Sequence, residues 1–127
     1  MASVIYLDTH VVAWLFVGQT ASLSNLAKEL VDGHDLLISP IVLLELEFLR
    51  EVGKTEVPPA KILETLGSDL GLKVCAKPFG DVVHESLRLR WTRDPFDRLI
   101  TAHASLNQNW LLTRDEGIRR HYKHAVW

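Results

Sequence analysis

Two aspartates stand three residues apart in RDPFDRLI, residues 93–100, where an apolar helix is expected to begin. Asp94 followed by Pro95 is typical of a helix N-cap and first helical residue, which places Asp97 in the first turn. A capping box would explain both acids, because Asp97 would then accept the backbone N–H of Asp94. Alternatively, the positive end of the helix dipole would hold both acids ionised and ready to bind a cation.

Two further acids closely follow apolar runs that we interpret as strands. Asp8 comes directly after SVIYL, and Asp115 comes one residue after NWLLT, in which Thr113 can hydrogen-bond a nearby carboxylate. Each acid has an ordinary explanation as the N-cap of the next helix. Each also falls at the carboxyl end of a strand, which is where a parallel sheet binds its ligand.

Glu45 lies inside the apolar segment IVLLELEFL, which we interpret as a helix. Helical spacing from Ile41 groups Leu44, Glu45 and Phe48 on one apolar face. The same spacing places Glu47 toward solvent. A carboxylate on an apolar face is costly unless it is paired, hydrogen-bonded or bound to a metal, so Glu45 fits either a buried salt bridge or a metal site.

The acids of these segments have a common chemistry if the fold brings them together. Several ionised carboxylates within a few ångströms would repel one another and raise one another's pKa values, and a divalent cation removes that penalty. Ligation by oxygen alone favours Mg²⁺ or Mn²⁺ over Zn²⁺. Such sites activate a water and stabilise the leaving oxygen in phosphodiester cleavage. The acids predicted to share this site are Asp8, Glu45, Asp97 and Asp115, with Asp94 as the cap.

The elements that must position these acids alternate along the whole chain. We expect strands at residues 3–7, 35–39, 72–76 and 109–113, and a fifth, edge strand in the final HAVW. We expect helices at residues 10–16, 25–31 closed by Asp32 and Gly33, 40–52, 79–90 and 95–106, one within EVPPAKILETL, and a short one after Asp115. This alternation predicts one domain over residues 1–127, with a parallel sheet covered by helices on both faces.

Composition and charge narrow the class of protein. Residues 1–87 carry 6 Lys/Arg and 12 Asp/Glu, whereas residues 88–127 carry 8 and 4, so a net charge of −2 hides a basic C-terminal third. That region suits a polyanionic ligand, although solvated helix faces are its more ordinary explanation. The only cysteine, Cys75, excludes an intrachain disulfide and is expected in the core. No apolar run reaches the roughly 18 residues of a membrane span, so we expect a soluble cytoplasmic protein.

Four segments resemble a known family in their order and spacing. YLDTHVVAWL, SPIVLLELEFL, RDPFDRLITAHA and LLTRDE are similar to segments of PIN-domain ribonucleases, and more narrowly of the VapC-like toxins of type II toxin–antitoxin pairs. The resemblance implies a three-layer α/β/α sandwich with a four- or five-stranded, mainly parallel sheet. It also implies Mg²⁺- or Mn²⁺-dependent cleavage of RNA, a homodimer, inhibition by a cognate antitoxin protein, and contact with operator DNA only through that antitoxin.

The resemblance also assigns roles to individual residues. Its catalytic and metal-binding acids correspond to Asp8, Glu45, Asp97 and Asp115. Thr9 and Thr113 would orient Asp8 and the water on the metal, and Asp94 would be an accessory or capping residue. Arg98 and Arg114 are expected to bind the substrate backbone, although Arg114 stands where many relatives carry a small residue.

Other classes of protein fit the sequence less well. A phosphohydrolase of the haloacid-dehalogenase type would use Asp8 as a covalent nucleophile, but it needs a second Asp where His10 stands. His121 and His124 have no Cys or His partner at a zinc-like spacing, and no phosphate-binding glycine loop occurs. A non-catalytic PIN-like module that binds an antitoxin and takes part in transcriptional regulation is the alternative that stays open. Packing rather than base stacking is the interpretation for Trp14, Trp91, Trp110 and Trp127.

Overall fold

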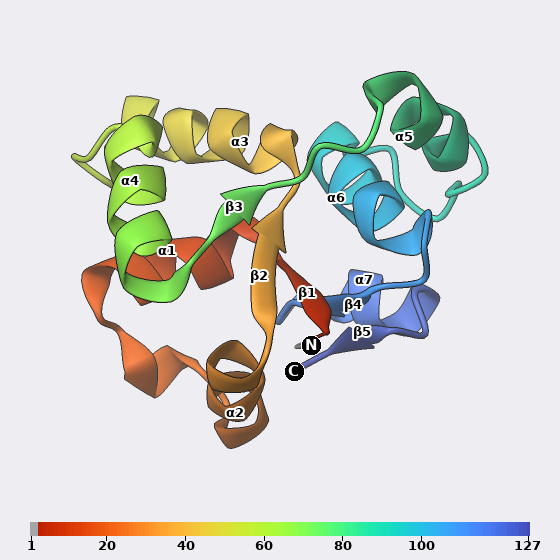
Figure 1. Ribbon diagram of the computed structural model, residues 1–127. Coiled ribbons are helices and arrows are strands. Elements are labelled where there is room, and N and C mark those ends of the chain that lie inside the picture. The colour runs from red at the N-terminus through yellow and green to blue at the C-terminus, as the bar shows by residue number, and fades with distance from the viewer. Residues whose placement is uncertain (1–2) are drawn as a thin grey trace.

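The computed structural model describes residues 3–127, in which five strands form a parallel sheet (Figure 1). The strands are β1 (Val4–Leu7), β2 (Asp35–Ile38), β3 (Lys73–Val74), β4 (Trp110–Leu112) and β5 (Ala125–Val126). They lie in the order β3-β2-β1-β4-β5, and every neighbouring pair is parallel. The predicted domain begins at residue 1, and its first two residues lie outside the described part of the chain.

Helices cover both faces of this sheet. They are α1 (Thr9–Val17), α2 (Asn25–Gly33), α3 (Pro40–Glu51), α4 (Pro59–Leu70), α5 (Phe79–Ser86), α6 (Pro95–Ser105) and α7 (Glu116–His121), with a short 3₁₀ turn, η1, at Thr20–Ser22. In Figure 1, α1, α3 and α4 pack together on one side of the sheet, and α5, α6 and α7 lie on the other. The predicted three-layer α/β/α sandwich is therefore confirmed. No helix within residues 3–127 is both long and apolar enough to cross a membrane.

The centre of the core lies around β1 and β4. Ile5, Leu7, Leu111 and Leu112 are fully buried, and Tyr6 is only 1% exposed. A strand covered on both faces buries all of its side chains, which is why these runs are continuously apolar instead of alternating with polar residues.

The third strand is shorter than the sequence predicts. The expected strand at residues 72–76 is reduced to β3, because this edge strand has a single neighbour, β2, and pairs with it through two residues. Leu72 and Cys75 on either side of β3 are still buried, at 3% and 6% exposure. Cys75 is thus a core residue, as predicted.

Two helix ends also differ from expectation. Helix α5 ends at Ser86, before the predicted end at Arg90. The Ser86 carbonyl accepts hydrogen bonds from the Arg98 guanidinium at 2.8 and 3.2 Å, and the Ser86 hydroxyl donates to the Val83 carbonyl at 2.6 Å. The backbone N–H groups of Leu87 and Leu89 bond three residues back, to His84 and Ser86, so the α-helical pattern ends there in a tighter turn. Gly33, predicted to close α2, is its last helical residue, and extended backbone rather than a left-handed turn follows.

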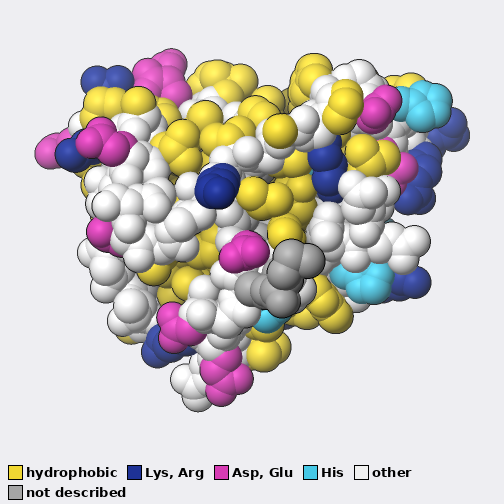
Figure 2. Space-filling view, in the orientation of Figure 1, with side chains coloured by type: hydrophobic (Ala, Val, Ile, Leu, Met, Phe, Trp, Pro, Cys, Tyr) yellow, Lys and Arg dark blue, Asp and Glu magenta, His cyan; other side chains and the backbone are white. Residues whose placement is uncertain are grey.

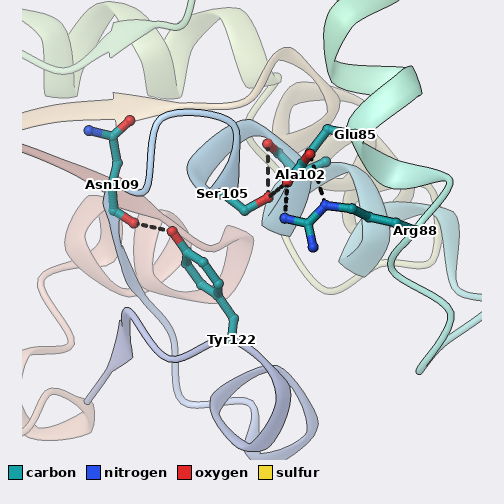
Figure 3. A network of polar contacts seen from close by, with 6 residues as sticks. All are labelled: Glu85, Arg88, Ala102, Ser105, Asn109 and Tyr122. Carbon is teal, nitrogen blue, oxygen red and sulfur yellow. Dashed lines mark hydrogen bonds and ion pairs between the residues drawn. The ribbon is translucent and has the colours of Figure 1, made fainter.

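A polar network fixes α6 against α5 (Figure 3). Glu85 of α5 accepts hydrogen bonds from Arg88 at 2.6 Å and from the hydroxyl of Ser105 of α6 at 2.7 Å, and the bond from Arg88 holds the pKa of Glu85 below its usual range. The Tyr122 hydroxyl, after α7, donates to the carbonyl of Asn109, just before β4. These bonds set the position of α6, whose N-terminus carries two of the candidate acids.

Five helices begin at an N-cap side chain, and two of them begin at one edge of the sheet. Four N-cap side chains accept backbone N–H groups of the helices that they open: Ser24, Ser39, Asp94 and Asp115. Asp8 caps α1 in the same way, since its side chain accepts the N–H of Thr9. The caps of α1 and α7 follow the carboxyl ends of β1 and β4, so these helices begin where a parallel sheet binds its ligands.

Candidate active site

A cavity of about 490 Å³ opens at the carboxyl ends of β1 and β4. The chain passes from β1 to β2 on one side and from β4 to β5 on the other, and ligands of such sheets bind where the direction of the connections changes. The residues that line it are Asp8, His10, Val11, Trp14, Glu45, Asp94, Asp97, Arg114 and Asp115. All four acids predicted to share a site therefore lie around one cavity.

Asp8 is the most buried of these acids, at 8% exposure. One carboxylate oxygen accepts the backbone N–H of Thr9 at 2.8 Å, and the other accepts the hydroxyl of Thr113 at 2.6 Å. Burial raises the pKa of Asp8, and these two hydrogen bonds oppose that shift because they favour the ionised form. The side chain is consequently held in one orientation at the floor of the cavity.

Glu45 reaches the same floor from α3. The buried Thr9 hydroxyl donates a hydrogen bond to its carboxylate, so Thr9 contacts two of the acids at once. Burial raises the pKa of Glu45, the nearby Asp8 raises it further, and the bond from Thr9 lowers it. No positive side chain within residues 3–127 pairs with Glu45, which removes the buried salt bridge that the sequence allowed.

The apolar face of α3 differs from the predicted one. Val42 and Leu46 are buried, whereas Leu44 and Phe48 are each 45% exposed. Glu45 therefore borders a stripe that begins at Val42 rather than at Ile41. The alternating apolar and acidic residues of this helix allow either register, and packing against the sheet selects one.

Asp97 lies in the first turn of α6 and takes no part in a capping box. Asp94 accepts the N–H groups of Phe96 and Asp97 at 2.8 and 3.2 Å, but its own N–H donates to the Thr92 hydroxyl at 3.1 Å. Within the described residues, no group donates a hydrogen bond to the Asp97 carboxylate. Burial raises the pKa of Asp97 to about 7, and the carboxylates around the cavity add to the shift. Those carboxylates belong to Asp94, Asp115, Asp8 and Glu45.

Asp115 is connected to Asp8 through Thr113. The Thr113 hydroxyl accepts the backbone N–H of Asp115 at 3.0 Å and donates to Asp8, so one buried hydroxyl orients both segments. The Asp115 side chain also accepts the N–H of Ile118 at 2.8 Å as the cap of α7. Gly117 leaves room for this arrangement, because an added Cβ would lie 3.1 Å from an Asp115 carboxylate oxygen.

The two arginines predicted to bind substrate have different positions. Arg114 lines the cavity, with its guanidinium carbon 6.0 Å from the ring centroid of Trp14. Arg98 does not line it, since its guanidinium binds the Ser86 and Leu87 carbonyls at the end of α5. The structure therefore brings only Arg114 to the acids.

Sequence reasoning missed two residues of the cavity wall. Trp14 was interpreted as a packing group and His10 was given no role in the site, yet both line the cavity from α1. Their i, i+4 spacing on a helix that begins directly after Asp8 was the available indication, because such residues share a helix face.

The donor set suits a hard divalent cation by its chemistry. It consists of carboxylate oxygens with threonine hydroxyls behind them, and Asp97 has a half-buried carboxylate without a hydrogen-bond donor. Within residues 3–127, no three Asp, Glu, His or Cys side chains are already arranged to hold a metal ion together.

Comparison with known proteins places this geometry in context. A profile of the PIN domain matches residues 5–124. No curated protein sequence matches the chain. A chain of the crystal structure of VapBC2 from Rickettsia felis, bound to a DNA fragment from their promoter, is similar with a TM-score of 0.65 and 22% identity. The match covers 93% of this chain and 92% of that chain, and at this identity it demonstrates a shared fold.

Proposed function

The chain belongs to the PIN domain family, and from this membership we propose that it is a metal-dependent endoribonuclease and the toxin of a toxin–antitoxin pair. PIN domains are generally nucleases that use divalent metal ions. The observation that carries the proposal is the unbonded carboxylate of Asp97, whose pKa is raised to about 7 beside the other acids. Such an arrangement is unfavourable for folding alone and becomes favourable when a cation binds.

Asp8, Glu45, Asp97 and Asp115 would hold Mg²⁺ or Mn²⁺. Bound there, the cation would activate a water and stabilise the leaving oxygen during hydrolysis of a phosphodiester. Thr9 and Thr113 support this role because they keep Asp8 in a fixed orientation before substrate arrives. Fixed donors need no reorganisation during the reaction, which lowers its barrier.

The cationic residues of the chain suit an RNA substrate. Arg114 lines the cavity beside the acids and has the planar donor geometry that matches a phosphate. The basic residues 88–127 would attract the backbone over longer range, with an effect that falls as salt concentration rises.

A protein partner is the second part of the proposal. Leu44 and Phe48 on α3, and Phe79 with Leu87 at the two ends of α5, are 45–58% exposed. Figure 2 shows apolar side chains exposed along the part of the surface that these helices occupy. Exposed apolar surface of this kind is typical of protein interfaces, so we assign it to a homodimer and to a cognate antitoxin, which alone would contact operator DNA.

RNA cleavage by the purified protein tests the proposal. We expect a single-stranded RNA to be cut in Mn²⁺ or Mg²⁺, and the cleavage to stop with EDTA or with Asp97→Asn. Glu47→Gln is the matched control, because Glu47 does not line the cavity and pairs with Arg50 at 3.3 Å. Intact RNA under all of these conditions, together with binding of an antitoxin, would instead favour a non-catalytic regulatory module.

A further inference from the structure

One part of the cavity wall is aromatic and cationic, in contrast to its acidic floor. Trp14 of α1 and Arg114, which follows β4, line the cavity together with the carboxylates. The Arg114 guanidinium lies over the Trp14 ring at 6.0 Å from its centroid, within the range of a cation–π interaction. We propose that Trp14 is a positioning residue that holds Arg114 as the phosphate-binding group of this site, an inference that rests on the proposed nuclease function.

Trp14 is itself held in place by aromatic neighbours. Trp127 packs against it with ring centroids 5.8 Å apart, and His10 lies 6.0 Å away on the same helix face. Trp127 directly follows β5, and the preceding Val126 carbonyl accepts the backbone N–H of Thr113 at 3.0 Å. Trp127 therefore connects the Trp14 ring to the end of β4, where Thr113 binds Asp8. This connection fixes the position of the Trp14 ring relative to the acids.

Arg114 makes no ion pair with the acids around it. Within residues 3–127, no carboxylate oxygen lies within 4.0 Å of its guanidinium, and no hydrogen bond involves that group, although Asp115 is its neighbour in sequence. Its backbone carbonyl accepts a hydrogen bond from Arg119 at 3.3 Å, which anchors the segment.

An arginine beside several carboxylates would ordinarily turn toward them and form ion pairs. The Trp14 ring offers the guanidinium another contact that leaves its N–H donors free. This contact has two consequences for the site. The carboxylates stay available for a cation, and the guanidinium keeps the donors with which arginine binds phosphate through paired hydrogen bonds.

Steady-state cleavage of an RNA oligonucleotide in Mn²⁺ tests the proposal. Trp14→Leu should raise KM about tenfold and leave kcat within about twofold, since it weakens a charge-assisted contact made equally before and during the reaction. Trp14→Phe should restore most of the affinity because it keeps an aromatic face. Arg114→Ala should raise KM at least as much, and adding Trp14→Leu to it should change KM little, because the two act as one unit.

Matched controls separate this role from general effects. Trp110→Leu removes a tryptophan that is 42% exposed and does not line the cavity, and Lys28→Ala removes an exposed charge from α2, outside the basic residues 88–127. Both should leave KM near that of the parent. The proposal is wrong if Trp14→Phe is as impaired as Trp14→Leu, if kcat falls while KM stays constant, or if the effects of Trp14 and Arg114 add fully.

A second measurement does not depend on cleavage. In ¹⁵N NMR spectra recorded with Mg²⁺, AMP should shift the Nε–H signal of Arg114 in the parent and shift it much less in Trp14→Leu. If AMP shifts the Arg114 signal in the parent and less in Trp14→Leu, but RNA is not cut, the proposed function fails and the phosphate site stands. If RNA is cut while Trp14→Leu matches the parent in KM and in its response to AMP, only the role of Trp14 fails. If RNA is not cut and AMP leaves the signal unmoved, both are wrong.

Discussion

Asp94 accepts the backbone N–H of Asp97 at 3.2 Å, but Asp97 returns no hydrogen bond to Asp94, whose N–H is bound by Thr92. The two acids of DPFD therefore differ in role although they lie in the same turn. Asp94 accepts backbone N–H groups at the N-terminus of α6, and Asp97 keeps a carboxylate without a hydrogen bond at the cavity.

The first prediction separates these two acids. Asp94→Ala should lower the free energy of unfolding by about 0.5–2 kcal/mol, because it removes a helix cap, and RNA cleavage well below the melting temperature should survive. Asp97→Asn should abolish cleavage with little loss of stability in metal-free buffer. Urea unfolding and an RNA cleavage assay measure the two properties. An inactive Asp94→Ala beside an active Asp97→Asn would mean that the roles are reversed.

The second prediction concerns pH. The pKa of Asp97 is raised to about 7 from an ordinary value of 3.8, so the folded state binds this proton more tightly than the unfolded state. Its contribution to stability is full below about pH 4 and is lost as pH rises through 7. In EDTA at pH 8, Asp97→Asn should therefore be more stable than the parent by on the order of 1–2 kcal/mol, after allowance for partial exposure.

Urea unfolding of both proteins at pH 5 and pH 8 measures this difference, which should shrink at pH 5. Burial also raises the pKa values of Asp8 and Glu45, but those shifts occur in both proteins and largely cancel in the comparison. Equal stability of parent and variant at pH 8 would contradict the raised pKa of Asp97.

The third prediction compares the two glutamates of α3. Glu45→Gln should reduce cleavage by orders of magnitude, because it removes a charge from the floor of the cavity. Glu47→Gln should leave cleavage nearly unchanged, since Glu47 pairs with Arg50 near the surface and does not line the cavity. Both substitutions preserve side-chain size, so kcat/KM reports on charge. Equal losses in the two variants would show that the position around α3 does not matter.

The fourth prediction compares two buried threonines. Thr113→Val should lower the free energy of unfolding by about 1–3 kcal/mol, because Asp8 and the N–H of Asp115 each lose a hydrogen-bond partner. Cleavage should fall as well. Thr101→Val is the matched control: its buried hydroxyl has no partner in the described residues, so the substitution should be neutral or stabilising. Thermal unfolding of the two variants distinguishes these outcomes, and equal melting temperatures would contradict the role of Thr113.

The sequence predicts the local features of the fold, such as helix starts and strands, because residues close together in the chain determine them. Ser39 before Pro40 and Asp94 before Pro95 both open helices, since the cap and the restricted proline act within one turn. The apolar run before Asp8 is β1, and the parallel arrangement followed from the alternation of strands and helices. That alternation places Asp8 and Asp115 at the same edge without knowledge of any contact.

Other features were decided only by tertiary structure. The buried register of α3, the turn of Arg98 toward α5 and the contact of Arg114 with Trp14 each depend on residues distant in the chain. The capping box of Asp97 also fits the sequence, yet Thr92 takes the N–H that it requires. A side chain with several local partners of similar energy is directed by the packing around it, and such packing exists only after the sheet and its helices have assembled.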